Sequence, residues 1–277
     1  MFAAQGCHVR RAQLACPPLR RLLGAEDTPL SLCACSVLCR DESSRAALLA
    51  AGASEVVVAD VMQPASAAAA VAAAAPGLIL SAVGTSPPEP ICSDADAAGT
   101  SSLVAAAVAH APLARFVFVS ALGVGESLDC LPHASQDVLR PWLERKEKAE
   151  GVLQGSGLEW TVLRPGPLTD APRSGSAVAT LDAVSGKAFS TLSRADLAHI
   201  AYQARAHALA FSICARTQQF TLPGSPRAAT CVAQACVSPA ACRRTLAVLD
   251  GGRVIIAAPF LRELEPWEAA PFDEFAF

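Results

Sequence analysis

The chain has 277 residues, of which 52% are hydrophobic, and it carries a formal net charge of −3. This length suits one large α/β domain or two small ones, with enough apolar surface for a substantial core. No stretch of about 18 residues is apolar without interruption, so no membrane-spanning helix is predicted. The 22 lysines and arginines form no basic run, which argues against a nucleic-acid partner.

The chain contains 11 cysteines, an odd number in a protein too large to need disulfide staples. We therefore expect free, buried thiols and a reducing, cytoplasmic compartment. Cys33, Cys35 and Cys39 would share one buried face of a strand. A zinc site would need a second, closely spaced group of ligands, so no metal site is predicted.

Residues 1–24 form a divergent N-terminal segment that contains four arginines and no acidic residue. An organellar transit peptide has this composition, which gives a plastid or another organelle as the alternative localisation. The other interpretation is a divergent or missing first strand–helix unit. We favour the latter because residues 18–40 already have the pattern of the fold.

Apolar runs alternate with helical segments along residues 25–222. The predicted strands are Leu32–Cys39, Glu55–Ala59, Leu78–Val83, Arg115–Ser120, Trp160–Leu163 and Gln219–Leu222. The predicted helices are Ser43–Ala51, Pro64–Ala75, Asp96–His110, Gln136–Gln154 and Arg194–His207. This alternation predicts an α/β fold with a doubly wound, mostly parallel, Rossmann-like sheet and right-handed crossovers.

Residues 223–277 follow a different pattern. They contain a predicted hairpin, Leu246–Ala257, that turns at Asp250-Gly251-Gly252 and precedes an acidic and aromatic tail. We expect this C-terminal extension to pack on the domain or to add a pair of edge strands. No chemistry is predicted for it.

Ligands of an open parallel sheet bind outside the carboxyl ends of its strands. The candidate site residues are therefore those that end the predicted strands, namely Arg40, Asp60, Ser81 to Gly84, Ser120 to Gly123 and Arg164 to Gly166.

Five segments resemble the atypical short-chain dehydrogenases/reductases of the NmrA-like, NAD(P)-binding kind. They read VLCRDESSRAALLAAGASEVVVADV, LILSAVG, DAAGTSSLVAAAVAHAPLARFVFVSALGVG, KEKAEGVLQGSGLEWTVLRPGPLTDAP and LSRADLA. They occur in the family's order, and the resemblance as a whole covers roughly residues 30–222. The resemblance implies an NAD(P)-binding domain over residues 25–222. Its partners would be a dinucleotide and a small molecule.

At the adenosine side, the resemblance gives roles to three residues. Arg40 would hold the 2′-phosphate of NADP, which favours NADP over NAD, since a guanidinium can bind phosphate through two hydrogen bonds. The alternative is a surface arginine. Asp60 and Val61 would border the adenine ring, and the alternative for Asp60 is a turn or helix-capping residue.

The resemblance places five further residues around the phosphates, ribose and nicotinamide. Ser81, Ala82 and Gly84 would line the loop beside the phosphates and ribose, where small residues permit close approach of the backbone. Pro165 and Gly166 would form the loop at the nicotinamide. The alternative in both places is a simple turn after a strand.

Ser120 and Lys146 occupy the positions of the family's catalytic serine and lysine. The Ser120 hydroxyl could orient a substrate carbonyl, and Lys146 would hold the nicotinamide ribose. The alternatives are a serine that caps the end of a strand and a solvated lysine on a helix face.

The chain departs from the family in two respects. Classical members carry a tyrosine one helical turn before the lysine, but this position is Trp142, whose indole cannot act as an acid or base near neutral pH. The only tyrosine is Tyr202. In addition, residues 1–24 contain only Gly6 and Gly24, so the glycine-rich phosphate-binding turn is absent and the central strand position is empty or filled by Phe2–Val9.

Two functions follow from these observations. The first is a weak NAD(P)H-dependent oxidoreductase that acts on a small carbonyl or quinone-like substrate, with Ser120 or a water supplying the proton. The second is a non-catalytic Rossmann protein that senses NADPH or serves as a scaffold or assembly factor. Trp142 and the absent glycine-rich turn favour the second.

Overall fold

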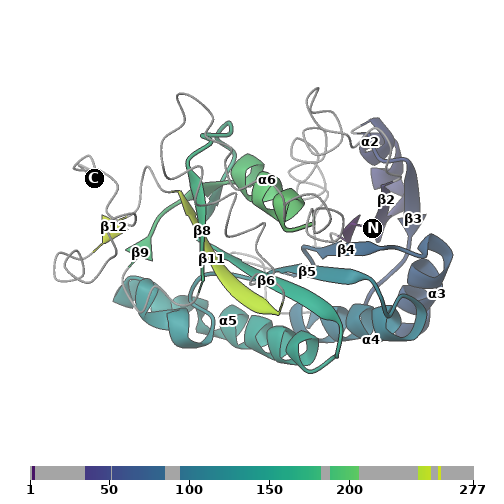
Figure 1. The fold of residues 1–277 in the computed structure, drawn as a ribbon, viewed down its shortest axis with the longest axis horizontal. Coiled ribbons are helices and arrows are strands. Elements are labelled where there is room, and N and C mark those ends of the chain that lie inside the picture. The colour runs from purple at the N-terminus through teal and green to yellow at the C-terminus, as the bar shows by residue number, and fades with distance from the viewer. Residues whose placement is uncertain are drawn as a thin grey trace, which may run out of the picture.

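The computed structural model describes residues 2–3, 35–50, 52–84, 94–181, 188–205, 243–250 and 255–256. Its main sheet has eight strands in the order β3-β2-β1-β4-β5-β6-β11-β8 (Figure 1). Every neighbouring pair is parallel except β11 and β8. The predicted α/β class with a mostly parallel sheet is therefore confirmed.

The strands of the main sheet are short, as expected of segments buried on both faces. They are β1 (Phe2–Ala3), β2 (Ser36–Cys39), β3 (Glu55–Val58), β4 (Leu78–Ser81), β5 (Arg115–Val119), β6 (Glu159–Pro165), β8 (Ala177–Leu181) and β11 (Arg244–Asp250). Two small pairs lie beside them, β7 (Leu168–Thr169) with β10 (Leu192–Ser193) and β9 (Ala188–Phe189) with β12 (Ile255–Ile256).

The central position of the sheet is occupied by β1. Phe2 pairs with Val37 of β2, and Ala3 pairs with Ser81 of β4. The sequence left this position either empty or filled by the N-terminal stretch, and the structure shows that it is filled. Residues 4–34, where a first helix would follow β1, lie outside the described residues, as does the predicted strand Gln219–Leu222.

The helices begin and end close to the predicted limits. They are η2 (Glu42–Ser44), α2 (Arg45–Ala50), α3 (Pro64–Ala74), η3 (Ala95–Gly99), α4 (Thr100–His110), η4 (Gly125–Cys130), α5 (His133–Gln154) and α6 (Arg194–Arg205). Pro64 stands in the first turn of α3, where its missing N–H costs nothing. The predicted helix from Asp96 differs in that it opens with a wide, π-helical turn, η3, before α4.

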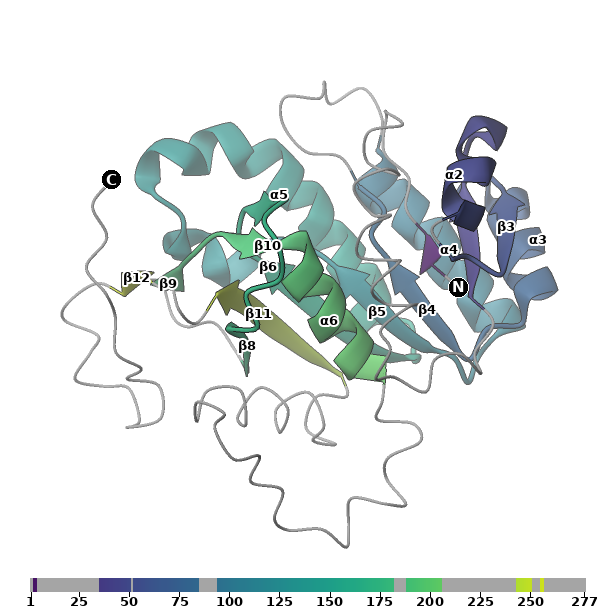
Figure 2. The same ribbon diagram turned by 90° about the horizontal axis from the view of Figure 1, so that it is seen from above.

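Helices cover both faces of the sheet. α3, α4 and α5 lie on one face, and α2 and α6 lie on the other (Figures 1 and 2). Alternate residues of β5 enter the two cores: Phe116 and Phe118 pack toward α4, whereas Val117 packs with Leu197 of α6. This alternation explains why the strand is apolar on both sides.

The predicted hairpin Leu246–Ala257 is not formed. Leu246 in β11 pairs with Leu163 of β6 on one side and with Leu181 of β8 on the other, while β12 pairs with β9. Both edges of β11 are therefore hydrogen-bonded, and no edge remains for a returning strand. The physical reason is burial, because residues 246–249 are all buried, as in a central strand.

The cysteines in the described residues are free thiols, as expected. Cys39 and Cys130 are buried, and Cys35 is half-buried. Burial raises the pKa of the Cys39 thiol, which packs with Val37 and Leu48. These thiols act as small apolar side chains.

The placement of β11 gives a stability prediction. Leu246 is fully buried, so Leu246→Ala should lower the free energy of unfolding by about 2–5 kcal/mol. Leu113→Ala is the matched control, because Leu113 is 95% exposed and its truncation should cost less than about 0.5 kcal/mol. Urea unfolding measures both values. Equal effects would contradict the burial of β11 within the sheet.

Candidate functional site

The carboxyl ends of β1 to β6 lie along one edge of the sheet, because these strands are parallel. The strand order turns at β1 and β4, which are neighbours although two strand–helix units separate them in the sequence. In open α/β sheets this switch point is where ligands bind. The edge beside β4 is therefore the candidate site.

A buried ion pair joins α5 to η3 at this edge. Lys146 Nζ lies 2.9 Å from Asp96 Oδ1, and the two side chains are 12% and 0% exposed. The ammonium also lies 6.0 Å from the centroid of the Phe118 ring, within range of a cation–π contact. Lys146 is thus not a solvated residue of the helix face.

Gly84, which follows β4, lies directly against this ion pair. A Cβ atom at residue 84 would stand 2.3 Å from Asp96 Oδ1 and 2.8 Å from Lys146 Nζ. The φ angle of +153° also disfavours any side chain there. The structure thus brings together two predicted site residues, Gly84 and Lys146, with Asp96, which the sequence indicated only as the start of a helix.

A second, more exposed ion pair lies next to the first. Arg145 Nε is 3.6 Å from Asp94 Oδ1, and the two side chains are 28% and 55% exposed. Two consecutive cations of α5 are therefore paired with two aspartates that flank the beginning of η3. The repeated acidic residues in DADAAG were the only sequence signal of this contact.

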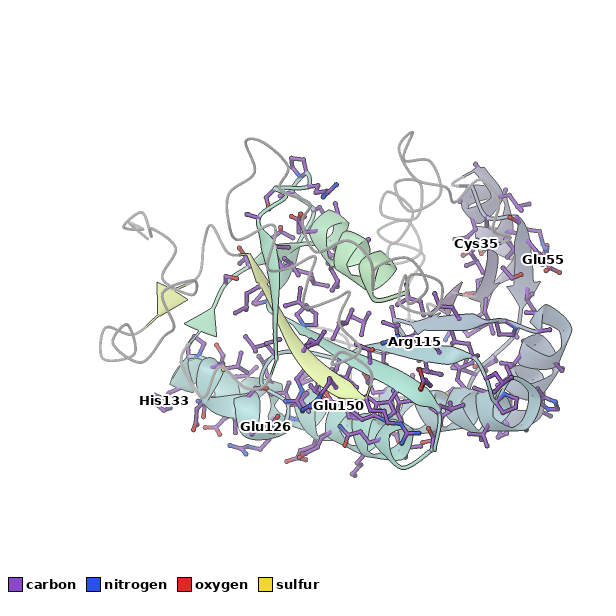
Figure 3. All side chains as sticks on the ribbon, in the orientation of Figure 1. Cys35, Glu55, Arg115, Glu126, His133 and Glu150 are labelled. Atoms are coloured by element: carbon purple, nitrogen blue, oxygen red, sulfur yellow. The ribbon has the colours of Figure 1, made fainter. Side chains whose placement is uncertain are left out.

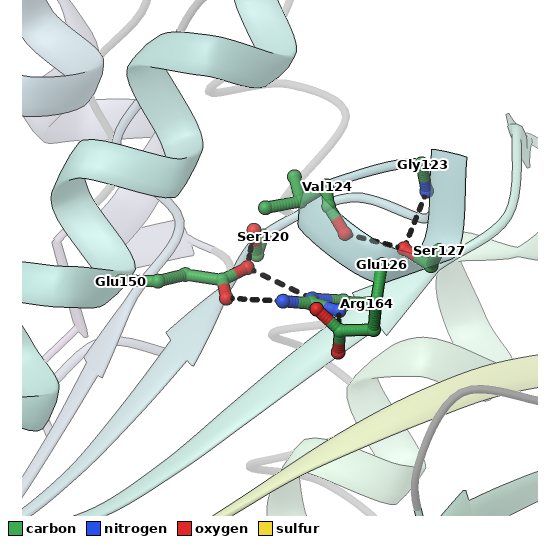
Figure 4. A network of polar contacts seen from close by, with 7 residues as sticks. All are labelled: Ser120, Gly123, Val124, Glu126, Ser127, Glu150 and Arg164. Carbon is green, nitrogen blue, oxygen red and sulfur yellow. Dashed lines mark hydrogen bonds and ion pairs between the residues drawn. The ribbon is translucent and has the colours of Figure 1, made fainter.

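Ser120 belongs to a different buried network (Figure 4). Its Oγ donates a hydrogen bond to Glu150 Oε1 at 2.5 Å. Arg164 binds the same carboxylate through Nε at 3.1 Å and Nη2 at 2.7 Å. Arg164 Nη1 also contacts Glu126 Oε1 at 2.7 Å. Glu150 belongs to α5 and Glu126 to η4, and both are labelled in Figure 3.

The pKa values of Arg164 and Glu126 shift in the directions that favour their charged forms. Burial alone would lower the pKa of Arg164, but its hydrogen bonds to Glu150 and Glu126 raise that pKa overall. Burial alone would raise the pKa of Glu126, but hydrogen bonds from its own backbone and from Arg164 lower it overall. The Ser120 proton is directed to Glu150, so its hydroxyl could orient a substrate carbonyl only if that bond were broken.

The residues predicted at the adenosine side end β2 and β3 as expected. Arg40 is 46% exposed and lies 3.8 Å from Asp41. Asp60 Oδ1 accepts a hydrogen bond from the backbone N–H of Met62 at 2.9 Å, which is the turn role considered as its alternative. The side chain of Val61 is buried in the core.

The end of β4 offers a buried hydroxyl. Ser81 is fully buried, and its Oγ has no hydrogen-bond partner among the described residues. Ala82 is half-buried. The small residues at 81, 82 and 84 leave room for close approach to the backbone next to the Lys146–Asp96 pair.

The turn after β6 packs against its own chain. The carbonyl of Pro165 accepts a hydrogen bond from Leu122 N at 2.8 Å, and Gly166 N donates to Val248 O at 3.3 Å. A Cβ at Gly166 would lie 2.1 Å from the carbonyl oxygen of Ser190. Glycine is therefore required here by the approach of residue 190.

Trp142 lies one helical turn before Lys146 on α5. Its side chain is half-buried, and the indole Nε1 is buried with no hydrogen-bond partner among the described residues. Tyr202 lies in α6, which covers the opposite face of the sheet from α5 (Figure 1). The described residues thus place an indole where classical members have a phenol.

Asp196, in the first turn of α6, fixes the loop that follows β7 at Ser174 and Gly175. It accepts hydrogen bonds from the backbone N–H groups of Ser174 and Gly175 at 2.9 and 3.0 Å and from Ser193 Oγ at 2.7 Å. Burial alone would raise the pKa of Asp196, but these bonds lower it overall. The start of α6 and the loop are therefore tied together.

The described part of the chain contains no group of three histidine, cysteine or acidic side chains arranged to hold a metal ion. None of its helices combines the length and apolar character required to span a membrane.

A family model described as NAD(P)H-binding matches residues 33–208. The matched segment makes up more than half of the chain, and the protein belongs to this NAD(P)H-binding family. The match begins after the N-terminal segment that lacks the glycine-rich turn. A search of curated protein sequences finds no match.

Solved structures share the fold. The anaerobillin reductase ChuY of Escherichia coli O157:H7 is 19% identical, with a TM-score of 0.59 over 90% of this chain and 96% of that one. A putative NAD-dependent epimerase/dehydratase from Bacillus halodurans is 18% identical, with a TM-score of 0.60 over 95% of this chain and 99% of that one. A short-chain dehydrogenase/reductase from Veillonella parvula, solved in complex with NADP, is 16% identical, with a TM-score of 0.57 over 91% of this chain and 95% of that one. At such identities the similarity establishes the fold alone.

The Ser120 network gives a second prediction. Glu150→Ala would leave the buried guanidinium of Arg164 without its main partner, so the free energy of unfolding should fall by about 3–5 kcal/mol. Glu126→Ala is the matched control, because Glu126 pairs with the same arginine but is 60% exposed. Its loss should cost about 1 kcal/mol or less. Thermal and urea unfolding measure both, and equal losses would contradict the dominance of the buried pair.

Proposed function

We propose that this protein binds NADPH at the carboxyl edge of the sheet and acts as a weak oxidoreductase on a small carbonyl or quinone-like substrate. Family membership supports the dinucleotide class. The observation that carries the proposal is the Lys146–Asp96 ion pair against Gly84, at the switch point of the sheet.

The arrangement fits a ribose ligand. An ammonium group has three N–H donors, and the contact with Asp96 requires only one. Asp96 fixes the position of Lys146, which can then direct its other donors to ribose hydroxyls. The glycine at residue 84 allows a ligand to approach the same point of the backbone.

Arg40 supports a preference for NADP over NAD. Its guanidinium is half exposed at the end of β2, next to the central strand. It is therefore available for a bidentate contact with a 2′-phosphate. Bound NADPH would supply the hydride, while the protein's own residues hold the ribose and position the acceptor.

The alternative is a non-catalytic NADPH sensor or scaffold. Two observations favour it: Trp142 replaces the acid–base tyrosine, and the sequence after β1 has Gly6 but Val9 and Ala12 at the other glycine positions of a GxxGxxG motif. Cofactor binding without turnover of carbonyl or quinone acceptors would support this alternative.

Gly84→Ala tests the site directly. The new Cβ would displace Lys146 and Asp96, so the Kd for NADPH should rise at least about tenfold. Gly77→Ala is the matched control, since a Cβ at residue 77 would meet no atom within 4 Å. Fluorescence titration measures the Kd, and circular dichroism confirms folding. Unchanged affinity in a folded Gly84→Ala protein would contradict this location, and no NADPH binding by the wild type at about 1 mM would contradict the function itself.

Arg40→Glu tests the cofactor preference. Loss of a charge-assisted phosphate contact should raise the Kd for NADPH about 10- to 100-fold and leave that for NADH within about threefold. Arg140→Glu is the control, because Arg140 is a similarly exposed arginine (49% against 46%) on α5. Calorimetric titration of both cofactors measures these values. An equal loss for NADH and NADPH would show that Arg40 does not recognise the 2′-phosphate.

A further inference from the structure

A buried arginine lies at the amino edge of the sheet, opposite the candidate site. Arg115, labelled in Figure 3, begins β5 and is 7% exposed. Its Nη2 donates a hydrogen bond to Thr161 Oγ1 at 3.0 Å, and its Nε is buried with no acceptor among the described residues. No carboxylate of these residues forms an ion pair with the guanidinium. A buried charge is costly unless it is paired, so the missing counterion requires an explanation.

A second arginine lies on the same face of the sheet. Arg244 begins β11 and is the register partner of Thr161 in β6. Arg115, Thr161 and Arg244 each stand two residues before a member of the apolar cluster beneath α6, so all three lie on the face that α6 covers. Arg244 is exposed, and within the described part of the chain its side chain forms no hydrogen bond or ion pair. Thr161 therefore lies between two arginines on neighbouring strands.

The surroundings supply little negative charge. Glu159 is the register partner of Arg115, but its side chain is exposed and the guanidinium binds Thr161 instead. α6 runs from β10 towards the start of β11 (Figure 2), and the negative end of its dipole offers only about half a charge. Residues 206–242, which join α6 to β11 in the sequence, contain two arginines and one histidine but no aspartate or glutamate. The chain that leads to this edge thus adds cations and no carboxylate.

Two arginines in this position select a phosphate group. Guanidinium groups present N–H donors in a fork that matches the oxygens of an anion. The bond to Thr161 fixes the guanidinium of Arg115, and its Nη1 forms no hydrogen bond to the described residues. A phosphomonoester carries nearly two negative charges near neutral pH, which matches two arginines. A carboxylate carries one and would leave one arginine without a counterion.

We propose that Arg115 and Arg244 bind a phosphate group at the amino edge of the sheet, beside the end of α6. The site is separate from the proposed cofactor site, because the Lys146–Asp96 pair lies at the carboxyl edge. A phosphorylated ligand would therefore bind together with NADPH rather than in its place. Its binding would supply the counterion that Arg115 lacks and so stabilise the folded protein.

Calorimetric titration of the full chain with inorganic phosphate, at about pH 8 and constant ionic strength, tests the site. We expect a Kd of about 1 mM or tighter for the wild type and at least about tenfold weaker binding by Arg115→Met, which keeps an apolar stem without the charge. Arg244→Gln changes an exposed residue, so it serves if Arg115→Met does not fold, and it should weaken binding about three- to tenfold. Arg140→Gln, at an exposed arginine of α5, is the matched control and should bind as the wild type does. Acetate should bind at least about tenfold more weakly than phosphate.

Thermal unfolding gives a second readout. Without phosphate, Arg115→Met should have a higher Tm than the wild type, because it removes a buried charge that has no counterion. Phosphate should raise the Tm of the wild type more than that of Arg115→Met. Glu159→Gln should keep the phosphate affinity, and a large fall of Tm in this variant would identify Glu159 as the counterion and overturn the proposal. Equal phosphate affinity in the wild type, Arg115→Met and Arg244→Gln would overturn it as well.

Two further titrations separate this site from other sources of binding. Phosphate can also occupy the proposed cofactor site, so Arg40→Glu is titrated in parallel and should keep the binding that depends on Arg115. The Kd for NADPH should be the same in Arg115→Met and the wild type, so either proposal can fail without the other. Phenyl phosphate that binds as tightly as inorganic phosphate supports a phosphomonoester as the ligand, whereas its exclusion supports free phosphate.

Discussion

The buried ion pair between Lys146 and Asp96 is the contact on which the geometry of the candidate site depends. Removing two charged groups from water costs several kcal/mol per ion, and their mutual contact offsets much of this cost. Neither residue can therefore move away alone without leaving a buried charge unpaired. Because the pair also lies against Gly84, it fixes α5, η3 and the end of β4 relative to one another. Three segments that are distant in the sequence are thus held at one point of the sheet edge.

A second buried pair completes the attachment of α5. Lys146 and Glu150 are four residues apart, and on an isolated helix they would pair with each other for only about 0.2–0.5 kcal/mol. In the folded protein each binds a tertiary partner instead, Asp96 on η3 and Arg164 on β6. Two anchors on different elements fix the rotation of the helix about its axis. The direction of Trp142, one turn before Lys146, follows from this constraint.

The sequence predicts the parts of this structure that depend on local pattern. The apolar run of β5 and the proline in the first turn of α3 are features of neighbouring residues. The structure forms a strand and a helix at these places, as their sequences predict. Contacts between residues that are distant in the sequence have no local pattern that predicts them. Lys146 was identified by its position in a motif, but the burial of Asp96 depends on how η3 packs against α5. The C-terminal strand shows the same limit. The turn sequence Asp250-Gly251-Gly252 favoured a hairpin locally, whereas burial of β11 between β6 and β8 determines its actual pairing.

The two departures from the family affect different steps. The sequence of residues 1–24 lacks the glycine-rich turn that holds a pyrophosphate, so under the proposed function more of the cofactor affinity would have to come from Arg40 and Lys146. Trp142 affects the acceptor instead. Its indole cannot transfer a proton to a developing oxyanion. General acid catalysis matters most when the product oxyanion is strongly basic. A conjugated acceptor such as a quinone gives a less basic oxyanion than a simple ketone, so it depends less on the missing phenol. Under the proposed function, the substitution would therefore suit quinone-like acceptors better than simple ketones.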